Sequence, residues 1–283
     1  MKMNHAPIDV IVPAYNEEEV IAGTLEHLLS DAQEGEFKVT VVCNGCRDRT
    51  AKVAREVSGN INVIELTEAS KTAAINAGLR RVRSSKIVLL DSDIKISTDD
   101  CRALAEALDG AEVDAAIGHM AINDKGCARS VRAFYRVWIR HPYVRNGKFA
   151  AAFAISREAM DKIGELPAVI ADDTYLKRMI SDDRVAVVDG VQFRVNVPKD
   201  FATLIRVRSR VRRGNRQLAH YAPRRQPAPN ANEENFFLSV CRRPSLWKDI
   251  PAYLVVSIAS RILALKSTSA WERDTTTRQA VTD

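Results

Sequence analysis

The stretch Lys86-Ile87-Val88-Leu89-Leu90-Asp91-Ser92-Asp93 decides the fold, because it carries an apolar run straight into two aspartates. Five mostly aliphatic residues that end in a polar turn are typical of a buried strand. Comparable runs stand at 8–12, 38–42 and 61–66, and amphipathic segments at 17–29, 47–57, 72–82 and 98–108. This alternation predicts an α/β fold with right-handed crossovers, a mostly parallel sheet and helices on both of its faces.

A different pattern begins after residue 118. It predicts a helix at 130–144 with one aromatic face, a strand at 149–155, a helix at 173–180, a hairpin-like strand pair at 185–188 and 191–195, and an arginine-rich helix at 201–218. The apolar segment that ends near residue 265 predicts a further helix. It could pack on the domain, form a dimer contact or lie in a membrane interface.

The composition is that of a globular protein. The chain has 283 residues, is 46% hydrophobic, and carries 42 Lys and Arg against 36 Asp and Glu, a formal charge of +6. Disordered, collagen-like and disulfide-stapled classes are therefore excluded. The excess of positive charge is too small to indicate nucleic-acid binding, so we expect no nucleic-acid partner.

The five cysteines and the lack of long apolar segments bear on the compartment. An odd cysteine count in a chain of this length suits a reducing environment. Cys43-Asn44-Gly45-Cys46 is interpreted as a strand end with an Asn-Gly turn, and a redox or zinc site is the alternative. No signal peptide and no run of 18 apolar residues is found, so we predict a cytoplasmic protein, with the inner face of the membrane as a second location.

Candidate ligand-binding residues follow the predicted strands, since open α/β sheets bind ligands beyond the carboxyl ends of their strands. The first strand ends in Pro13-Ala14-Tyr15-Asn16-Glu17, which lacks the glycines of a dinucleotide fingerprint or a phosphate loop. An aromatic ring, an amide and a carboxylate suit a base and a ribose. Asn44 and Asp48 follow the second strand.

Asp91 and Asp93 follow the fourth strand. Acidic side chains at neighbouring strand ends repel one another unless a cation joins them. Mg²⁺ and Mn²⁺ bind through one or two carboxylates and substrate phosphates, so this pair predicts a metal bridge to a diphosphate. The alternative is an Asp-rich turn and helix N-cap.

These motifs together resemble the family-2 glycosyltransferases, which have a GT-A fold. The resemblance rests on residues 13–18, on 44–48, on Lys71-Thr72-Ala73-Ala74-Ile75-Asn76-Ala77-Gly78 and on Asp91-Ser92-Asp93, and it runs from about residue 8 to 214. It implies an inverting transfer of a sugar from a nucleoside-diphosphate donor. It also implies a mostly parallel nucleotide-binding sheet flanked by helices, to which the sequence adds a C-terminal helical appendage.

The resemblance also implies roles for individual residues. The nucleotide-sugar site would comprise Pro13, Ala14, Tyr15, Glu17, Asn44, Asp48, Lys71, Asp91 and Ser92, with a divalent metal, Mn²⁺ or Mg²⁺, on Asp93. The catalytic base would be Asp173. A sugar hydroxyl is a poor nucleophile, so a base must lie within hydrogen-bond reach to take its proton. The acceptor or diphosphate side would comprise Gly147, Arg157, Asp172, Arg210 and Arg213. An acidic helix N-terminus at Asp172-Asp173 is the alternative.

The predicted arginine-rich helix departs from the family pattern. Arg210 matches the arginine of the Gln-x-x-Arg-Trp sequence found in processive members, but Val207 and Val211 replace the glutamine and the tryptophan. We therefore predict transfer of a single sugar. At helical spacing Arg210 and Arg213 share a face, and a solvated basic face is the alternative.

His119, which follows the fifth predicted strand, is not assigned to the metal.

We expect a glycosyltransferase domain at 1–219, with a nucleotide-sugar half at about 1–118 and an acceptor half at about 119–219. A linker at 220–246, an apolar helix at 247–266 and a disordered tail at 267–283 follow. The expected donor is a UDP- or GDP-sugar, the acceptor is lipid-linked or a saccharide, and peripheral membrane contact is a further expectation. A sugar-nucleotide pyrophosphorylase and a basic nucleic-acid-binding protein are the rival functions; the oligomeric state is left open.

Overall fold

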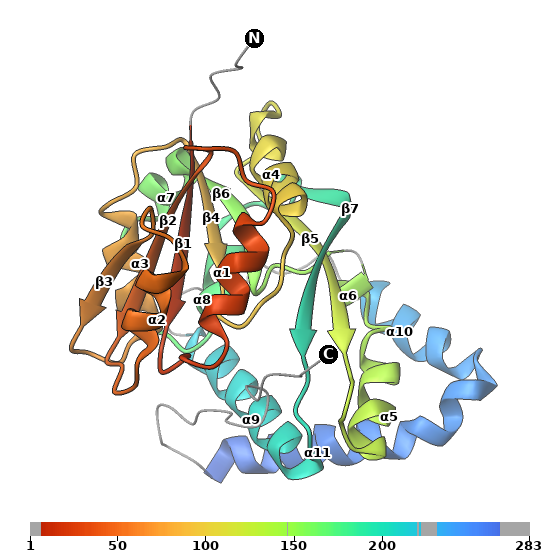
Figure 1. The fold of residues 1–283 in the computed structure, drawn as a ribbon. Coiled ribbons are helices and arrows are strands. Elements are labelled where there is room, and N and C mark those ends of the chain that lie inside the picture. Colours follow the sequence, from red (N-terminus) through yellow and green to blue (C-terminus); the bar gives the residue numbers. More distant parts are fainter. Residues whose placement is uncertain (1–6, 146, 220, 222–230, 267–283) are drawn as a thin grey trace.

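Seven strands form one mixed sheet in the computed structural model, which describes residues 7–145, 147–219, 221 and 231–266 (Figure 1). The strand order is β3-β2-β1-β4-β6-β5-β7. The strands are β1 (Ile8–Ala14), β2 (Phe37–Asn44), β3 (Asn62–Leu66), β4 (Lys86–Leu90), β5 (Ala115–Asn123), β6 (Ala152–Ser156) and β7 (Val185–Asn196). Among these, β6 alone runs against its neighbours β4 and β5, so the carboxyl ends of the other six face one edge. The prediction of a mostly parallel sheet is confirmed.

Helices cover both faces of the sheet, as the alternating pattern predicts. One face is packed by α1 (Ile21–Leu29), α2 (Thr50–Val57) and α4 (Thr98–Glu106), the other by α3 (Lys71–Leu79), α7 (Arg157–Ile163) and α8 (Asp172–Met179). Successive strand residues supply the two cores, because side chains alternate across a sheet. Val10 and Val12 thus pack on the first face and Ile11 on the second.

The remaining helices lie beside the long strands β5 and β7 and beyond the carboxyl edge (Figure 1). They are α5 (Arg129–Trp138), α6 (Pro142–Arg145), α9 (Phe201–Gln217), α10 (Ala231–Cys241) and α11 (Ile250–Lys266). Short 3-10 turns cover Ala107–Asp109, Asp182–Arg184 and Pro244–Asp249, the last being η3. The appendage predicted at the C-terminus is therefore helical and packs against α9 and α5.

Two predicted elements differ from the structure. The expected hairpin at 185–188 and 191–195 is wrong, because β7 is one continuous strand parallel to β5. The strand is irregular near its middle, where Gly190 has a φ of 87° and the pairing with β5 shifts register near Gly118. The chain nevertheless continues in the same direction. The single helix expected at 130–144 is instead α5 followed by the short α6, which begins at Pro142, a residue that cannot continue a preceding helix.

The predicted linker at 220–246 needs correction, because Ala231–Cys241 forms α10. The Pro- and Asn-rich part of that linker at 222–230 and the predicted tail at 267–283 lie outside the described residues. Within the described part of the chain, no helix combines the length and the hydropathy needed to cross a bilayer.

Candidate functional site

The loops after β1 and β2 are hydrogen-bonded to each other at the carboxyl edge of the sheet. Asp48 accepts hydrogen bonds at Oδ1 from the backbone N–H of Thr50 (3.0 Å) and from its hydroxyl (2.5 Å), and at Oδ2 from the N–H of Glu18 (3.3 Å). The N–H of Glu17 donates to the Thr50 hydroxyl oxygen at 2.6 Å. The predicted residues Glu17 and Asp48 therefore lie close together. Both carboxylate oxygens of Asp48 accept hydrogen bonds that connect the two loops.

Asn44 presents an unused acceptor at the end of β2. Its Nδ2 donates to the carbonyl of Ala14 at 2.8 Å, and the residue is 2% exposed. Its Oδ1 is buried and receives no hydrogen bond from the described residues. A buried amide oxygen with no donor is rare in folded proteins. The predicted Pro13 and Ala14 form the buried end of β1 beside it.

The turn between these loops is strained. Asn16 has a positive φ of 51°, and its Oδ1 accepts a hydrogen bond from the backbone N–H of Arg47 at 2.6 Å. The N–H of Asn16 donates to the sulfur of Cys46 at 3.2 Å. Strained backbone of this kind concentrates at functional sites. Tyr15, half-buried, lies in the same turn.

Cys43 and Cys46 are both free thiols. No group of three or more metal-ligating side chains gathers among the described residues, so the zinc alternative finds no support there. The turn at Asn44-Gly45 is the interpretation that fits, since Gly45 has a φ of 67° and a Cβ on it would lie 3.0 Å from Ala69.

A partly buried ion-pair cluster joins three elements at the same edge. The Nζ of Lys71 lies 2.7 Å from Oδ1 of Asp91 and 3.0 Å from Oδ2 of Asp172. Lys71 begins α3, Asp91 follows β4 directly, and Asp172 begins α8. The structure thus brings together three residues that the sequence analysis predicts from separate motifs.

The charges in this cluster shift one another's pKa. Burial lowers the pKa of Lys71, but the carboxylates of Asp172 and Asp91 outweigh it, so the pKa of Lys71 is raised. Burial raises the pKa of Asp172, and the neighbouring carboxylates of Asp173 and Asp91 add to this, while Lys71 opposes them. One ammonium group therefore balances more than one carboxylate, which leaves net negative charge in a poorly hydrated place.

Asp173 lies next to this cluster in the first turn of α8. It is half-buried, and its Oδ1 accepts a hydrogen bond from the backbone N–H of Thr174 at 2.6 Å. Its charge acts on two lysines, Lys71 and Lys148. The carboxylate is therefore held between cations at the edge where strand ends converge.

Lys148 and Arg208 are site residues that the sequence analysis missed. Burial lowers the pKa of Lys148, Asp173 raises it, and Arg208 lowers it further. The Lys148 ammonium lies 5.0 Å from the centre of the Trp138 ring, and the Arg208 guanidinium lies 5.1 Å from the same ring. Trp138 thus supports two cations that face the aspartates. In the sequence, the one feature that could have pointed to Lys148 is the glycine before it, Gly147. In the structure this glycine has a φ of 85°, which sets the direction of the chain that leads to Lys148.

The start of α8 is fixed by neighbours on both sides. Asn76 exchanges two hydrogen bonds with the backbone of Leu166, at 2.9 and 3.0 Å. Gln217 of α9 accepts from the N–H of Ile170 at 2.9 Å and donates to the carbonyl of Ala168 at 3.1 Å. A Cβ on Gly214 would lie 3.0 Å from the Cβ of Ala171, so α9 packs closely there. These contacts hold Asp172 and Asp173 rigidly.

The predicted residues on the acceptor side divide into two groups. Arg213 is 8% exposed and Arg210 is half-buried, both on α9. Gly147 lies against Ile117 and Val187, and a Cβ on it would lie 2.9 Å from Val187. These three lie on or against elements that border the aspartates.

Arg157 is not brought to the site. Because β6 is antiparallel to β4, the residue that follows β6 lies at the amino edge of β4, where Lys86 pairs with Ser156. Arg157 there contacts Asp161 at 2.9 Å and the carbonyl of Val82 at 3.0 Å. Its predicted place on the acceptor side is corrected.

Asp93, the predicted metal ligand, lies in the turn that directly follows β4 and Asp91. Asp91 is engaged by Lys71, and the described residues hold no cluster of three metal-ligating side chains. The backbone between the two aspartates is fixed, since the carbonyl of Ser92 accepts from the Thr24 hydroxyl at 2.8 Å. One carboxylate plus a diphosphate is a usual set for Mg²⁺ or Mn²⁺.

The fold is similar to that of several solved glycosyltransferases. A mannosyltransferase from Pyrobaculum calidifontis, in complex with GDP-Man and Mn²⁺, gives a TM-score of 0.62 at 21% identity, covering 94% of this chain and 77% of that chain. Glucosyl-3-phosphoglycerate synthase from Mycobacterium tuberculosis, with Mn²⁺ and UDP, gives 0.54 at 18% identity, covering 79% and 81%. At these identities the likeness shows the fold, which is of the GT-A type.

Curated relatives match in sequence over part of their length. A dolichyl-phosphate beta-glucosyltransferase from Trichomonas vaginalis is 26% identical over 155 residues, 50% of this chain and 48% of that protein. A dolichol-phosphate mannosyltransferase from Pyrococcus furiosus is 27% identical over 188 residues, 65% and 48%. The chain thus matches less than half the length of these relatives.

The sequence model described as glycosyl transferase family 2 matches residues 9–163, which is more than half of the 283 residues. The matched range holds both loops, Lys71, Asp91 and Asp93, while Asp172 and Asp173 lie just beyond it. The chain therefore belongs to glycosyl transferase family 2.

Proposed function

We propose that this enzyme transfers a single sugar from a UDP- or GDP-linked donor to a lipid-linked or saccharide acceptor, with inversion and with the help of a divalent metal. The observation that supports this best is the placement of Asp173 beside the ion-pair cluster of Lys71, Asp91 and Asp172. A carboxylate fixed next to a cationic, partly dehydrated edge suits proton removal close to a phosphate-bearing donor.

Asn44 supports the choice of a nucleotide whose base carries a ring N–H. Its Oδ1 is buried and accepts no hydrogen bond from the described residues. Uracil and guanine both present a ring N–H that such an oxygen would accept, so the feature fits UDP and GDP alike. Of the two similar solved structures, one contains GDP-Man and the other UDP.

Positive charge would receive the diphosphate of the donor. When bound at Asp93, Mn²⁺ or Mg²⁺ would supply electrostatic stabilisation of the leaving diphosphate. Lys71 keeps its charge at neutral pH because its pKa is raised, and Arg210 and Arg213 lie on the neighbouring α9. These fixed cations need no rearrangement as negative charge grows on the leaving group.

Asp173 would act as the general base. It would take the proton of the acceptor hydroxyl while that oxygen attacks the anomeric carbon on the face opposite the diphosphate. Attack from the opposite face inverts that carbon in one displacement. The contacts of Asn76, Gly214 and Gln217 with the segment before α8 keep the carboxylate in place, which matters because misplacement by about 1 Å costs about 100-fold in rate.

Replacing Asp173 by Asn tests the proposed base. We expect Asp173→Asn to lower kcat by about 10²- to 10⁴-fold, the range that general-base catalysis contributes. Binding of UDP or GDP in the presence of Mn²⁺, measured by calorimetry, should be unchanged.

The matched control is Asp161→Asn, at an exposed carboxylate on α7 near the opposite edge. It should keep both activity and nucleotide binding. Normal turnover by Asp173→Asn would contradict the base assignment. Failure of every nucleoside diphosphate to bind the wild-type protein would contradict the donor site.

A further inference from the structure

The helix α11 is apolar around its whole circumference, yet only one side of it is buried. On the inner side, Val256, Ser260 and Ala264 are at most 2% exposed. The outer side carries large apolar side chains that are 46% to 67% exposed: Leu254, Val255, Ile258, Ile262 and Leu265. A helix that is apolar all round is usually enclosed by other protein, so this outer side calls for an explanation.

The inner side is fixed by specific contacts, so the helix cannot turn its outer side inward. Arg212 donates to the Ser260 hydroxyl at 3.0 Å, and Arg216 donates to the carbonyl of Ala264 at 3.4 Å. The ring of Tyr253 stacks on Phe134 of α5 with 5.6 Å between centroids. The outer side is therefore a constant feature of the folded chain.

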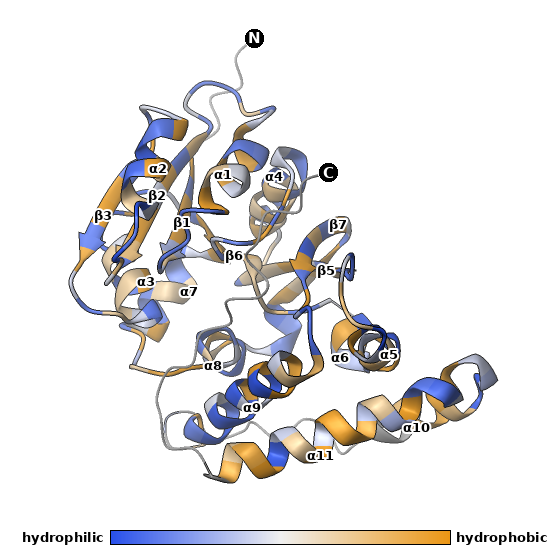
Figure 2. Cartoon of the chain, turned by 60° about the horizontal axis from the view of Figure 1, so that its bottom comes forward, coloured by the Kyte–Doolittle hydropathy of each residue, from blue (hydrophilic) through white to orange (hydrophobic). Residues whose placement is uncertain are grey.

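The exposed apolar surface continues onto the preceding turn and α10. Trp247 of η3 is 56% exposed, and its indole N–H donates to the carbonyl of Cys241 at 3.0 Å. Phe237 and Leu238 of α10 are also exposed. In Figure 2, α10 and α11 form one long arm across the front of the molecule, with hydrophobic residues along it. We call the side chains of Trp247, Leu254, Val255, Ile258, Ile262 and Leu265 the outer apolar face.

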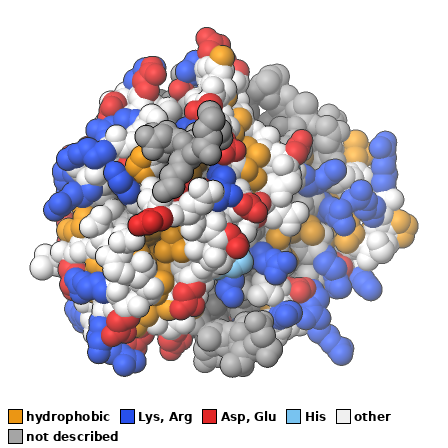
Figure 3. Space-filling view, turned by 45° about the horizontal axis from the view of Figure 1, so that its top comes forward, with side chains coloured by type: hydrophobic (Ala, Val, Ile, Leu, Met, Phe, Trp, Pro, Cys, Tyr) orange, Lys and Arg blue, Asp and Glu red, His pale blue; other side chains and the backbone are white. Residues whose placement is uncertain are grey.

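The charges around the outer apolar face have one sign. Arg242, Arg243, Lys248 and Arg261 are exposed there. Between residues 236 and 265, whose side chains the structure describes, the one acidic residue is Asp249, which is buried and paired with Arg136 at 2.8 Å. Figure 3 shows basic and hydrophobic side chains next to one another along the right-hand edge, the side on which Figure 1 places α10, while α11, at the bottom of Figure 1, is turned away in this view.

We propose that the outer apolar face docks on an anionic membrane surface. Apolar side chains enter the headgroup region while the surrounding Arg and Lys meet anionic lipid headgroups, the arrangement of an interfacial helix. A second copy of the chain is a poorer occupant, because a two-fold contact would set these cations against one another. The 17 residues of α11 span about 25 Å, less than the bilayer core of about 30 Å, so the helix lies along the membrane.

Docking in this way would bring the catalytic edge close to the lipid. The carboxyl ends of the parallel strands face α9, which packs between α11 and the start of α8 through Gly214. Two helix layers at 8–10 Å each put the membrane roughly 20 Å from Asp173. This step rests on the proposed function, and it selects a lipid-linked acceptor over a soluble saccharide.

Vesicle flotation of the full chain tests the docking without donor or acceptor. Vesicles of phosphatidylcholine alone and of phosphatidylcholine with 30% phosphatidylglycerol are the two probes. We expect binding to the anionic vesicles that is at least tenfold stronger than to the neutral ones and that weakens in high salt. Ile258→Glu and Ile262→Glu should each reduce binding at least tenfold. The matched control, Met179→Glu at an exposed apolar residue on α8, should bind as wild type.

Donor binding and light scattering distinguish docking from misfolding and from self-association. Each variant should keep the melting temperature and the nucleotide affinity of the wild type, since the substituted side chains touch solvent. Equal binding to both vesicles, or binding that survives both substitutions, would overturn the proposal. A wild-type dimer that Ile258→Glu dissociates, together with no vesicle binding, would overturn it in favour of a second copy. Loss of docking would leave the outcome of Asp173→Asn unaffected, so the two proposals fail separately.

Discussion

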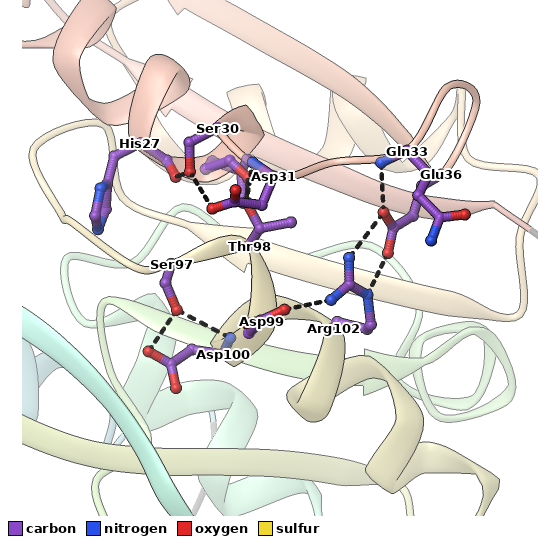
Figure 4. Close-up of polar contacts among 11 residues, drawn as sticks. His27, Ser30, Asp31, Gln33, Glu36, Ser97, Thr98, Asp99, Asp100 and Arg102 are labelled. Atoms are coloured by element: carbon purple, nitrogen blue, oxygen red, sulfur yellow. Dashed lines mark hydrogen bonds and ion pairs between the residues drawn. The ribbon is translucent and has the colours of Figure 1, made fainter.

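Two clusters in this molecule place one cation between two carboxylates, and they lie at opposite edges of the same sheet. At the carboxyl edge, Lys71 is paired with Asp91 and Asp172. At the amino edge, Arg102 of α4 is paired with Asp99 and with Glu36, which directly precedes β2 (Figure 4). Each cluster has one positive side chain and two carboxylates, so any difference in their roles comes from the residues around them.

The amino-edge cluster satisfies its own groups. Both oxygens of Glu36 are held by Arg102, at 2.5 and 3.1 Å, and the N–H of Gln33 adds a third bond at 2.9 Å. The hydrogen bond from Arg102 lowers the pKa of Glu36 against the effect of burial. The cluster thus ties the segment before β2 to α4.

The carboxyl-edge cluster has further charged groups next to it. Asp173 and Asp93 lie in the same segments as Asp172 and Asp91, and the pKa of Asp172 is raised by burial. Ionisable groups with shifted pKa values that gather at the carboxyl edge of a sheet are suited to a site that binds a metal or a charged substrate. The amino-edge cluster therefore holds two elements together, whereas the shifted pKa values at the carboxyl edge are typical of a functional site.

Removing the cation of each cluster should separate the two roles most strongly. We expect Lys71→Met to lower kcat/KM at least 100-fold, because the loss of one fixed cation at a developing negative charge costs about 3 kcal/mol. Arg102→Met should keep kcat/KM within about twofold, since it lies at the other edge. Steady-state kinetics with both variants measures this contrast. Equal loss of activity in the two would remove the distinction between the clusters.

The sequence predicts the carboxyl-edge cluster well because its members end or begin regular elements. The apolar run before Asp91 marks a buried strand, and the position after such a strand is where ligands bind. Lys71 and Asp172 each begin a helix, and their motifs stand at separate places in the chain. The contact between them depends on packing, which the motifs imply only through the family resemblance.

Sequence patterns fail for residues whose placement depends on strand direction or on packing. The run at 149–155 indicates a strand but not its direction, so the pattern could not correct the acceptor-side place that the resemblance implies for Arg157. Lys148 reaches Asp173 through the course of the chain after Gly147, which no periodicity reveals. In α11 the inner and outer sides are both apolar, so the pattern cannot say which one is buried.

A second, smaller contrast should appear in the free energy of unfolding when one partner of an ion pair is replaced and when both partners are replaced. Arg102→Met alone leaves Glu36 without its partner and should cost about 1 to 3 kcal/mol in the free energy of unfolding. The double variant Arg102→Met/Glu36→Gln should recover most of this loss and remain active. Lys71→Met/Asp172→Asn should likewise be more stable than Lys71→Met but stay inactive. Urea unfolding with parallel kinetics gives both quantities, and recovery of activity in the second double variant would contradict a role for Lys71 in transfer.

The smallest expected effect is a pH dependence of opposite sign in the two clusters. The pKa of Glu36 lies below its usual 4.5, so the stability it contributes is present above that value and is lost as the pH falls through the lowered pKa. The pKa of Asp172 lies above its usual 3.8, so its contribution is greatest below that value and is lost as the pH rises through the raised pKa. The free-energy difference between wild type and Glu36→Gln should therefore shrink as the pH falls from 6 to 3.5. As the pH falls over the same range, wild type should gain stability relative to Asp172→Asn, because protonation removes a buried charge that the amide lacks. Urea unfolding at several pH values measures how each free-energy difference changes with pH. Changes of the same sign would mean that the negative charge of Asp172 is stabilised by its neighbours as fully as that of Glu36.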